Sequence, residues 1–307
     1  MKTNKSLQPY GLSLLAATAV LLTGSALHAQ PLDDTPARAP AHFYTQLTLA
    51  PDDATSSGGG GAGADQESQE LALAKKLQNP VANLVSVPIQ NNWDFGIGPA
   101  NAMKYTANIQ PVIPFSISED WNLITRTILP VIYAESPVKG GRDHYGLSDT
   151  TQSFFLSPKA PVGGWIIGAG PVGYYPTATD SALGAGQWGA GPTIVALRQD
   201  HGFTYGILAN QIWSFEGWGD QAVNATYLQP FFTYTTKTRT SFSVNTESTY
   251  AWQAEQWTVP MNFMVQQLVK IGKQPIAFQF GYRYYTVKPD GGPDWGLRFA
   301  ITFLFPK

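Results

Sequence analysis

Apolar and polar side chains alternate at successive positions over long stretches of this chain, from about residue 84 to its last residues. In the run 276–284, for example, Phe280 and Tyr282 share one face, and Gln279 and Arg283 share the other. Successive side chains of a β-strand point to opposite sides, so this pattern predicts strands with one apolar and one polar face. Most runs exceed about ten residues, whereas soluble strands cluster near five or six and tilted membrane strands need about 9–11. Their length therefore favours a transmembrane β-barrel over a soluble sandwich.

The chain contains enough such runs for a large barrel. We predict an all-β fold, a closed antiparallel transmembrane β-barrel of about 12 strands that occupies residues 81–307. The predicted strands are 84–90, 104–117, 121–133, 148–158, 165–176, 187–198, 203–215, 223–236, 240–252, 257–270, 276–287 and 295–305.

The connections between these strands alternate in length. Gaps after odd-numbered strands, such as 91–103 and 134–147, are mostly long, and gaps after even-numbered strands, such as 118–120, are mostly short; 253–256 is the exception. Outer-membrane barrels have short periplasmic turns and longer outside loops. The alternation therefore predicts an even number of strands and both chain termini in the periplasm.

Aromatic residues gather near the predicted strand ends. They are Trp93, Phe95, Trp121, Tyr133, Trp213, Phe215, Trp252, Trp257 and Trp295. Rings with a polar group prefer the boundary between membrane and water. We interpret them as two aromatic girdles; the alternative is that they anchor the core of a soluble protein.

The first residues have the features of a secretory signal. Lys2 and Lys5 precede a short apolar stretch, and small residues follow it. This pattern predicts a signal peptide over 1–29, with cleavage after Ala29 or, as a second choice, after Ala26. The chain would then reach the cell outer membrane by export.

The segment between the signal and the barrel divides into two parts. Residues 30–65 are rich in Pro, Ala, Ser and Gly, which predicts a flexible linker. Residues 66–80 contain helix formers with leucines on one side, and Asn79-Pro80 ends the predicted short helix. This helix either plugs the lumen or stays exposed on its tether.

Composition excludes several classes of function. The chain has no cysteine, so disulfide and thiolate chemistry are excluded. A formal charge of −2 without a basic stripe gives no support for nucleic-acid binding. No nucleotide-binding motif is present, and we predict no cofactor and no metal site.

Polar side chains on the inner face are the candidates for function. The expected lumen or constriction residues are Asn108, Gln110, Arg126, Glu247, Gln279, Arg283 and Arg298. Isolated charges in a narrow barrel are costly, so we expect Glu247 to pair with Arg283 or Arg298, with Arg126 on the same belt. One interpretation is a constriction with a net positive field that favours anions or aromatic rings. The other is a salt-bridge network that braces or blocks the barrel.

A hydrolytic site receives little support from the sequence. Of the four histidines, only His144 and His201 lie in the predicted barrel, and the strand order places them on opposite sides of the membrane. A nucleophile and its base must lie within hydrogen-bond reach, so a site with two histidines is excluded. We therefore predict that the chain is not an enzyme.

Seven short segments form a set with a family resemblance. They are 79–84 (NPVANL), 88–92 (PIQNN), 119–126 (EDWNLITR), 176–180 (PTATD), 257–260 (WTVP), 270–275 (KIGKQP) and 289–299 (PDGGPDWGLRF). From about residue 66 onward, the chain resembles the outer-membrane transporters named for the meta-pathway of phenol degradation, many of which carry the mistaken label neuromedin U. The resemblance implies a porin-like barrel and uptake of aromatic or other hydrophobic compounds.

Together these patterns predict an outer-membrane, porin-like channel through which small molecules pass passively. Its expected partners are outer-membrane lipid, a small-molecule permeant, and the periplasmic chaperones and barrel-assembly machinery. The alternatives are a barrel enzyme that acts on lipids and a structural or adhesion barrel.

Overall fold

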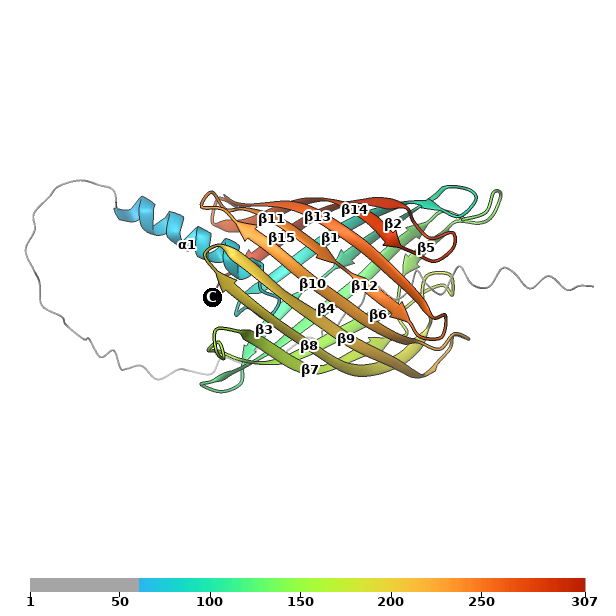
Figure 1. Ribbon diagram of the computed structural model, residues 1–307, viewed down its shortest axis with the longest axis horizontal. Helices are drawn as coiled ribbons and strands as arrows, with labels where there is room; N and C mark the ends of the chain where they lie inside the picture. The colour runs from blue at the N-terminus through green and yellow to red at the C-terminus, as the bar shows by residue number, and fades with distance from the viewer. Residues whose placement is uncertain (1–60, 307) are drawn as a thin grey trace, which may run out of the picture.

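Strand pairing closes the sheet into a barrel. In the computed structural model, which describes residues 61–306, β1 (Val85–Ile97) pairs antiparallel with the last strand, β15 (Trp295–Phe305). The ladder runs from Val85 opposite Phe305 to Phe95 opposite Trp295. Every other strand pairs with its neighbours in the chain, which confirms the predicted closed antiparallel barrel of 12 strands (Figure 1).

Three of the 12 strands are interrupted and are therefore numbered as two segments each: β2 with β3, β5 with β6, and β11 with β12. The break after β2 falls at Pro111, which has no backbone N–H for the ladder. The segments are β2 (Ala102–Ile109), β3 (Val112–Ser116), β4 (Trp121–Ala134), β5 (His144–Leu147), β6 (Thr150–Pro158), β7 (Ile166–Tyr175), β8 (Gln187–Asp200), β9 (Phe203–Gly217), β10 (Asn224–Thr235), β11 (Thr240–Thr246), β12 (Ser248–Ala251), β13 (Gln256–Ile271) and β14 (Gln274–Val287).

The two ends of the barrel differ in their connections. We call one the turn end; its connections are 117–120, 159–165, 201–202, 236–239 and 272–273. The other is the loop end, with connections 98–101, 135–143, 176–186, 218–223, 252–255 and 288–294. Most connections at the loop end are the longer ones, as the alternation predicts.

The prediction of an outside loop over residues 91–103 is wrong. Strand β1 continues through Asn91 and Trp93 to Ile97, and only 98–101 connects it to β2. Asparagines and glycines of this stretch resemble turn residues, but pairing with β2 and β15 overrides their weak local preference. Gly96, with φ +82°, lies at the register shift where the two strands bend.

The barrel has an apolar outer face and a polar inner face. Phe280, in the middle of β14, is 65% exposed, and its partner across the strand pair is Phe299. Inside, Asn92, Asn108 and Asn262 are at most 2% exposed. In a soluble protein, apolar side chains are mostly buried and polar side chains are mostly exposed. The reverse arrangement seen here suits a barrel surrounded by the acyl chains of a membrane.

Aromatic side chains contact one another near both ends of the barrel. At the loop end, Phe95 stacks on Trp295, and Tyr250 lies between Trp252 and Trp257. At the turn end, the ring contacts are those of Trp165 with Tyr205 and of Phe203 with Phe232 and Tyr234. These contacts agree with two aromatic girdles, one near each end of the barrel.

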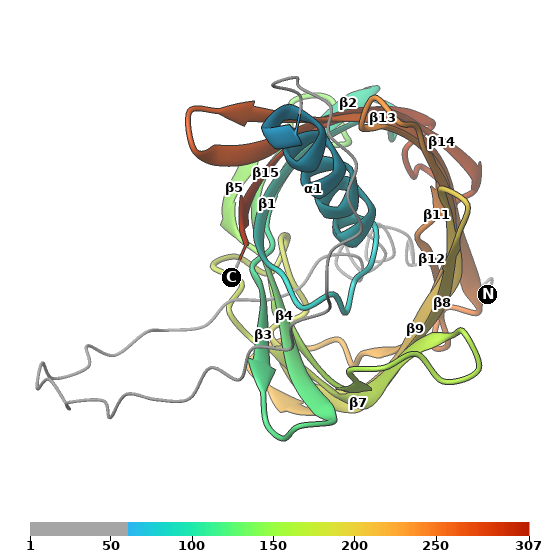
Figure 2. The ribbon, with the colours of Figure 1, turned by 90° about the vertical axis from the view of Figure 1, so that its left-hand side faces the viewer.

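Among the described residues one helix, α1 (Gly61–Leu77), precedes the barrel at the turn end; its N-terminal part projects beyond the strands, and its C-terminal part lies at the opening of the barrel (Figure 1 and Figure 2). It begins at Gly61, five residues before the predicted start, within the stretch expected to be a linker. After the helix, Asn79 accepts a hydrogen bond from the backbone N–H of Val81, and the chain turns into β1. The predicted signal peptide, 1–29, and residues 30–60 of the predicted linker lie outside the described residues.

No helix within residues 61–306 has the length and apolar character needed to cross a membrane.

Candidate functional site

A cavity of about 670 Å³ occupies the interior of the barrel. At the turn end, the cavity is lined by residues 76–80, which are the last residues of α1 and the segment after it. At the loop end, it reaches Arg142 and Pro293. All seven residues predicted from the sequence for the lumen line this cavity. The space is therefore a lumen that extends between the two ends.

A charged cluster lies on one side of the lumen. The carboxylate of Glu247, in the break between β11 and β12, accepts hydrogen bonds of 2.8 Å from both terminal nitrogens of Arg298 on β15. Arg283 on β14 approaches the same carboxylate to 3.6 Å. The structure thus brings together the three charges expected to pair, and Glu247 contacts both arginines.

A second carboxylate extends this cluster. Asp94 on β1 lies 3.6 Å from Arg283 and accepts a 2.8 Å hydrogen bond from the hydroxyl of Tyr285. The neighbouring Asn92 accepts a 2.7 Å hydrogen bond from the Nε–H of Arg298. The two arginines are therefore held by partners on several strands, as a brace would require.

The other predicted residues lie outside this cluster. Arg126 on β4 donates a 3.1 Å hydrogen bond to the amide oxygen of Gln110. Gln279 donates to Gln266 over 3.3 Å, and Asn108 is fully buried on β2. These four of the seven residues line the lumen without joining the ion-pair network.

The sequence analysis missed several lumen residues. Asn92 and Asp94 fall in the predicted loop 91–103, and Lys104, Tyr227 and Tyr285 fall in predicted strands without being proposed for the lumen. The sequence contained a signal for Asn92 and Asp94, because polar residues occupy every even position from Ser86 to Asp94 except Pro88. Continuing the strand pattern past residue 90 would have placed them on the inner face.

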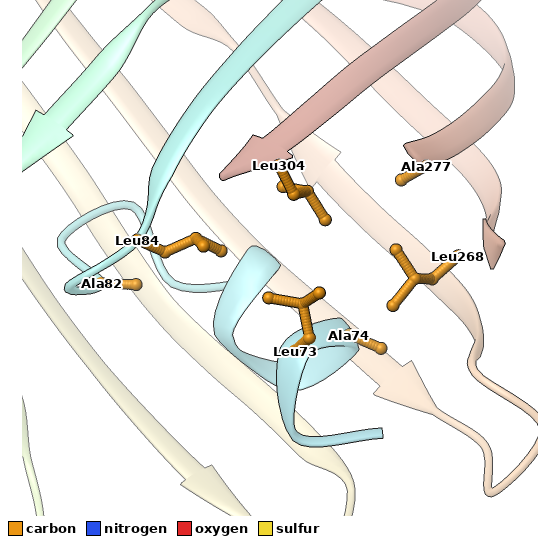
Figure 3. Packing of buried hydrophobic residues seen from close by; sticks show 7 residues of the cluster. All are labelled: Leu73, Ala74, Ala82, Leu84, Leu268, Ala277 and Leu304. Atoms are coloured by element: carbon orange, nitrogen blue, oxygen red, sulfur yellow. The ribbon is translucent and has the colours of Figure 1, made fainter. Parts of the chain in front are cut away.

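The turn end of the lumen is occupied by α1 and the segment that follows it. Leu73 and Ala74 of α1 pack with Ala82 and Leu84 and with wall residues of β13, β14 and β15 (Figure 3). The wall residues are Leu268, Ala277 and Leu304. This apolar contact fixes the helix to one side of the barrel.

Polar contacts secure the same segment. Arg239, in the turn between β10 and β11, forms an ion pair with Glu70 of α1. Gln199 donates a 2.8 Å hydrogen bond to the carbonyl of Lys75, and Gln78 donates to Gln266 on the lumen wall over 3.4 Å. The helix therefore contacts several strands at this end.

The opposite wall meets the same segment through Val81. This residue belongs to an apolar cluster with wall residues of β4, β6, β8 and β9. They are Ile124, Phe155, Val195, Leu197 and Leu208. Residues 73–84 consequently bridge the lumen from one wall to the other.

At the loop end, the connection 176–186 is anchored on the inner face. Asp149, fully buried between β5 and β6, accepts hydrogen bonds from the backbone N–H of Ala178 and Gly186 and from the hydroxyl of Tyr174. Leu183 of the same loop is buried and lines the cavity. The loop therefore narrows the lumen at this end.

A histidine and a carboxylate hold the tip of this loop. Nδ1 of His144 lies 2.9 Å from the carboxylate of Asp180. The backbone N–H of Ala182 and the ring of His144 stabilise the charged form, so the pKa of Asp180 lies below its usual value. The other described histidine, His201, contacts Asp200 in a turn at the opposite end. Within residues 61–306, no three side chains among His, Asp and Glu gather as a metal site would need.

No protein-family model and no curated protein matches the chain. Among solved structures, it is similar to the COG4313 outer membrane channel from Pseudomonas putida F1, with a TM-score of 0.57 and 14% identity. That match covers 73% of this chain and 96% of the channel. The chain has the fold of an outer-membrane channel.

Other solved barrels are similar over a comparable length but with lower scores. The beta domain of the Bordetella autotransporter BrkA has a TM-score of 0.37 and 11% identity, covering 72% of this chain and 100% of that domain. OmpT of Vibrio cholerae without loop L8 has a TM-score of 0.36 and 7% identity, covering 72% of this chain and 98% of OmpT. At 14% identity, the similarity to the COG4313 channel shows the fold alone.

Proposed function

We propose that this protein is an outer-membrane channel through which small molecules pass passively. The observation that carries the proposal is the lumen, a cavity of about 670 Å³ with polar side chains on its wall, which extends from the α1 segment to the loop end. A barrel of about eight strands is filled by side chains and one of about 16 leaves an open channel. Twelve strands leave room for small solutes only.

The outer face supports insertion in a membrane. Its apolar side chains match acyl chains, and the aromatic rings near both ends match the two interfaces. In this proposal the chain is exported by its signal peptide, carried by periplasmic chaperones and inserted by the barrel-assembly machinery. The refolded protein is then expected to migrate differently on gels before and after heating, and uniform migration would contradict insertion as a barrel.

Charges on the lumen wall favour anionic permeants. The basic residues that line the cavity outnumber the acidic ones; they are Lys76, Lys104, Arg126, Arg142, Arg283 and Arg298 against Asp94, Glu135 and Glu247. A field of one sign along a narrow passage raises the local concentration of the opposite ion. The family resemblance adds aromatic or other hydrophobic compounds to the proposed permeants.

The helix and the segment after it are proposed to act as a plug. Residues 66–80 contact both the β13–β15 wall and the turn between β10 and β11, so they occupy part of the opening at the turn end. An exposed helix on a tether would not make these contacts. We therefore prefer a plug that restricts passage.

Single-channel recording of the refolded full-length protein in planar bilayers tests the function. Discrete current steps with a reversal potential shifted toward the chloride potential are expected. A liposome-swelling assay with small and large sugars serves as the control for size exclusion. A folded, heat-modifiable barrel that passes neither ions nor sugars would contradict the proposal, and release of fatty acid from outer-membrane lipid would favour an enzyme instead.

A further inference from the structure

The three arginines of the lumen differ in how their charge is balanced. Arg298 and Arg283 each contact the carboxylate of Glu247, and Arg283 also contacts Asp94. Arg126 forms its hydrogen bond with the neutral amide of Gln110. Among the described residues, no carboxylate lies within the 4.0 Å of an ion pair with Arg126. Its charge is thus available to a molecule in the lumen.

The electrostatic surroundings of Arg126 leave that charge uncancelled. Glu247 is the carboxylate with which Arg126 interacts at longer range. That carboxylate already accepts two hydrogen bonds from Arg298 and lies 3.6 Å from Arg283. With one carboxylate facing two nearer arginines, the region around Arg126 retains a positive field.

Apolar and aromatic side chains line the lumen on two sides of the same guanidinium. Val112 pairs directly opposite Arg126 across β3 and β4. Val112, together with Tyr227 and Phe231 of β10, packs against the apolar cluster that contains Leu208 of β9, and all four side chains also line the lumen. Although β10 lies five strands from β4 in the barrel, Tyr227 interacts electrostatically with Arg126, so this surface faces the cation across the lumen.

We propose that Arg126 and the lumen-lining side chains of Val112, Leu208, Tyr227 and Phe231 make a binding subsite for small organic anions that carry one carboxylate on an apolar ring. This inference rests on the proposed channel function only in that the ligand arrives through the lumen. Benzoate is the probe that represents the class.

The two halves of the subsite act together. A guanidinium binds a carboxylate through two parallel hydrogen bonds, which fixes the orientation of the anion. Aromatic side chains prefer offset or edge contacts with another ring, and burial of the ring adds to the affinity. Acetate has the charge without the ring, and benzyl alcohol has the ring without the charge, so neither gains from both halves.

Binding is measured on the refolded full-length protein in detergent, by saturation-transfer NMR and titration calorimetry. Benzoate is expected to bind at least about tenfold more tightly than acetate or benzyl alcohol, a difference of about 1.4 kcal/mol. Arg126→Gln is expected to remove most of that advantage, and Arg126→Lys to retain part of it. Phe231→Ala is expected to weaken benzoate and leave acetate unchanged. Arg142→Gln, which removes a cation at the loop end of the same cavity, is the matched control and is expected to bind like the original protein.

The outcomes separate this inference from the proposed function. Equal binding of benzoate and acetate, or unchanged benzoate affinity in a heat-modifiable Arg126→Gln protein, overturns the subsite. A barrel that binds benzoate through Arg126 but carries no current contradicts the channel and leaves the subsite standing. A barrel that conducts ions but does not bind benzoate supports the channel and overturns the subsite.

Discussion

The carboxylate of Glu247 accepts two parallel hydrogen bonds from the guanidinium of Arg298, each 2.8 Å long. Glu247 lies in the break between β11 and β12, and Arg298 lies on β15, so the pair spans the two strands between them. Because Arg283 contacts the same carboxylate, one acidic side chain holds two arginines inside the barrel.

Replacement of this carboxylate is expected to destabilise the barrel. Glu247→Gln leaves two enclosed arginines with less compensation, and removal of one partner of a buried pair costs about 3–5 kcal/mol in a dry interior. The cavity admits water, so we expect a loss of about 2–3 kcal/mol in the free energy of unfolding. Urea unfolding in detergent micelles measures it. A Glu247→Gln/Arg298→Gln protein is expected to recover part of the loss, and an unchanged midpoint in the single variant would argue against the brace.

The two faces of β14 are expected to respond differently to the same substitution. Phe280→Arg places a cation on the apolar outer face in the middle of the strand, where arginine costs about 2–4 kcal/mol. Gln279→Arg places it one residue earlier, on the lumen wall, where a smaller effect is expected. Refolding into lipid vesicles and urea titration give both values. Equal destabilisation by the two variants is incompatible with the inside and outside assigned here.

Detachment of α1 is expected to raise conductance. Leu73→Asp introduces a carboxylate into the apolar cluster that fixes the helix to the wall, and a buried unpaired charge is costly. Ala72→Asp, on the exposed side of the same helix, is the matched control. Single-channel recording is expected to show larger current steps for Leu73→Asp and unchanged steps for Ala72→Asp. If the two variants conduct alike, the helix does not restrict passage.

The loop 176–186 is expected to loosen in acid. Because hydrogen bonds hold the pKa of Asp180 below its usual value of about 3.9, the charged carboxylate stabilises the loop at every pH above that value. This stability is lost as the pH falls through the lowered pKa. Hydrogen exchange of the loop amides, corrected for the intrinsic rate, is expected to rise below about pH 4. Asp180→Asn should exchange faster already at neutral pH, and a loop that stays protected in acid would rule out this role for Asp180.

Periodicity predicted the barrel because lipid and lumen impose opposite chemistry on the two faces of every strand. Arg283 and Arg298 each lie within a long alternating run, which is why the sequence indicates the inner face for both, and both line the cavity. Asp94 was missed because asparagines and glycines near it resemble a turn, and the pairing with β15 that overrides this preference is non-local.

The position of the helix could not be predicted from the sequence, for a different reason. The leucines of α1 indicate an apolar side, but no local pattern states that Leu73 would meet Leu268 or Leu304. The ion pair of Glu70 with Arg239 likewise joins residues far apart in the chain. Such contacts depend on the width and register of the closed barrel, and these become fixed only when all strands have paired.

Only residues 78–84 connect α1 to β1, and this short connection governs how the helix associates with the barrel. Docking is an intramolecular event, for which a short tether gives an effective concentration in the millimolar range. Contacts that would be too weak between separate molecules therefore suffice to keep the helix in place. Release and return of the helix are first-order processes, so the fraction of docked helices is independent of how many copies of the protein the membrane contains.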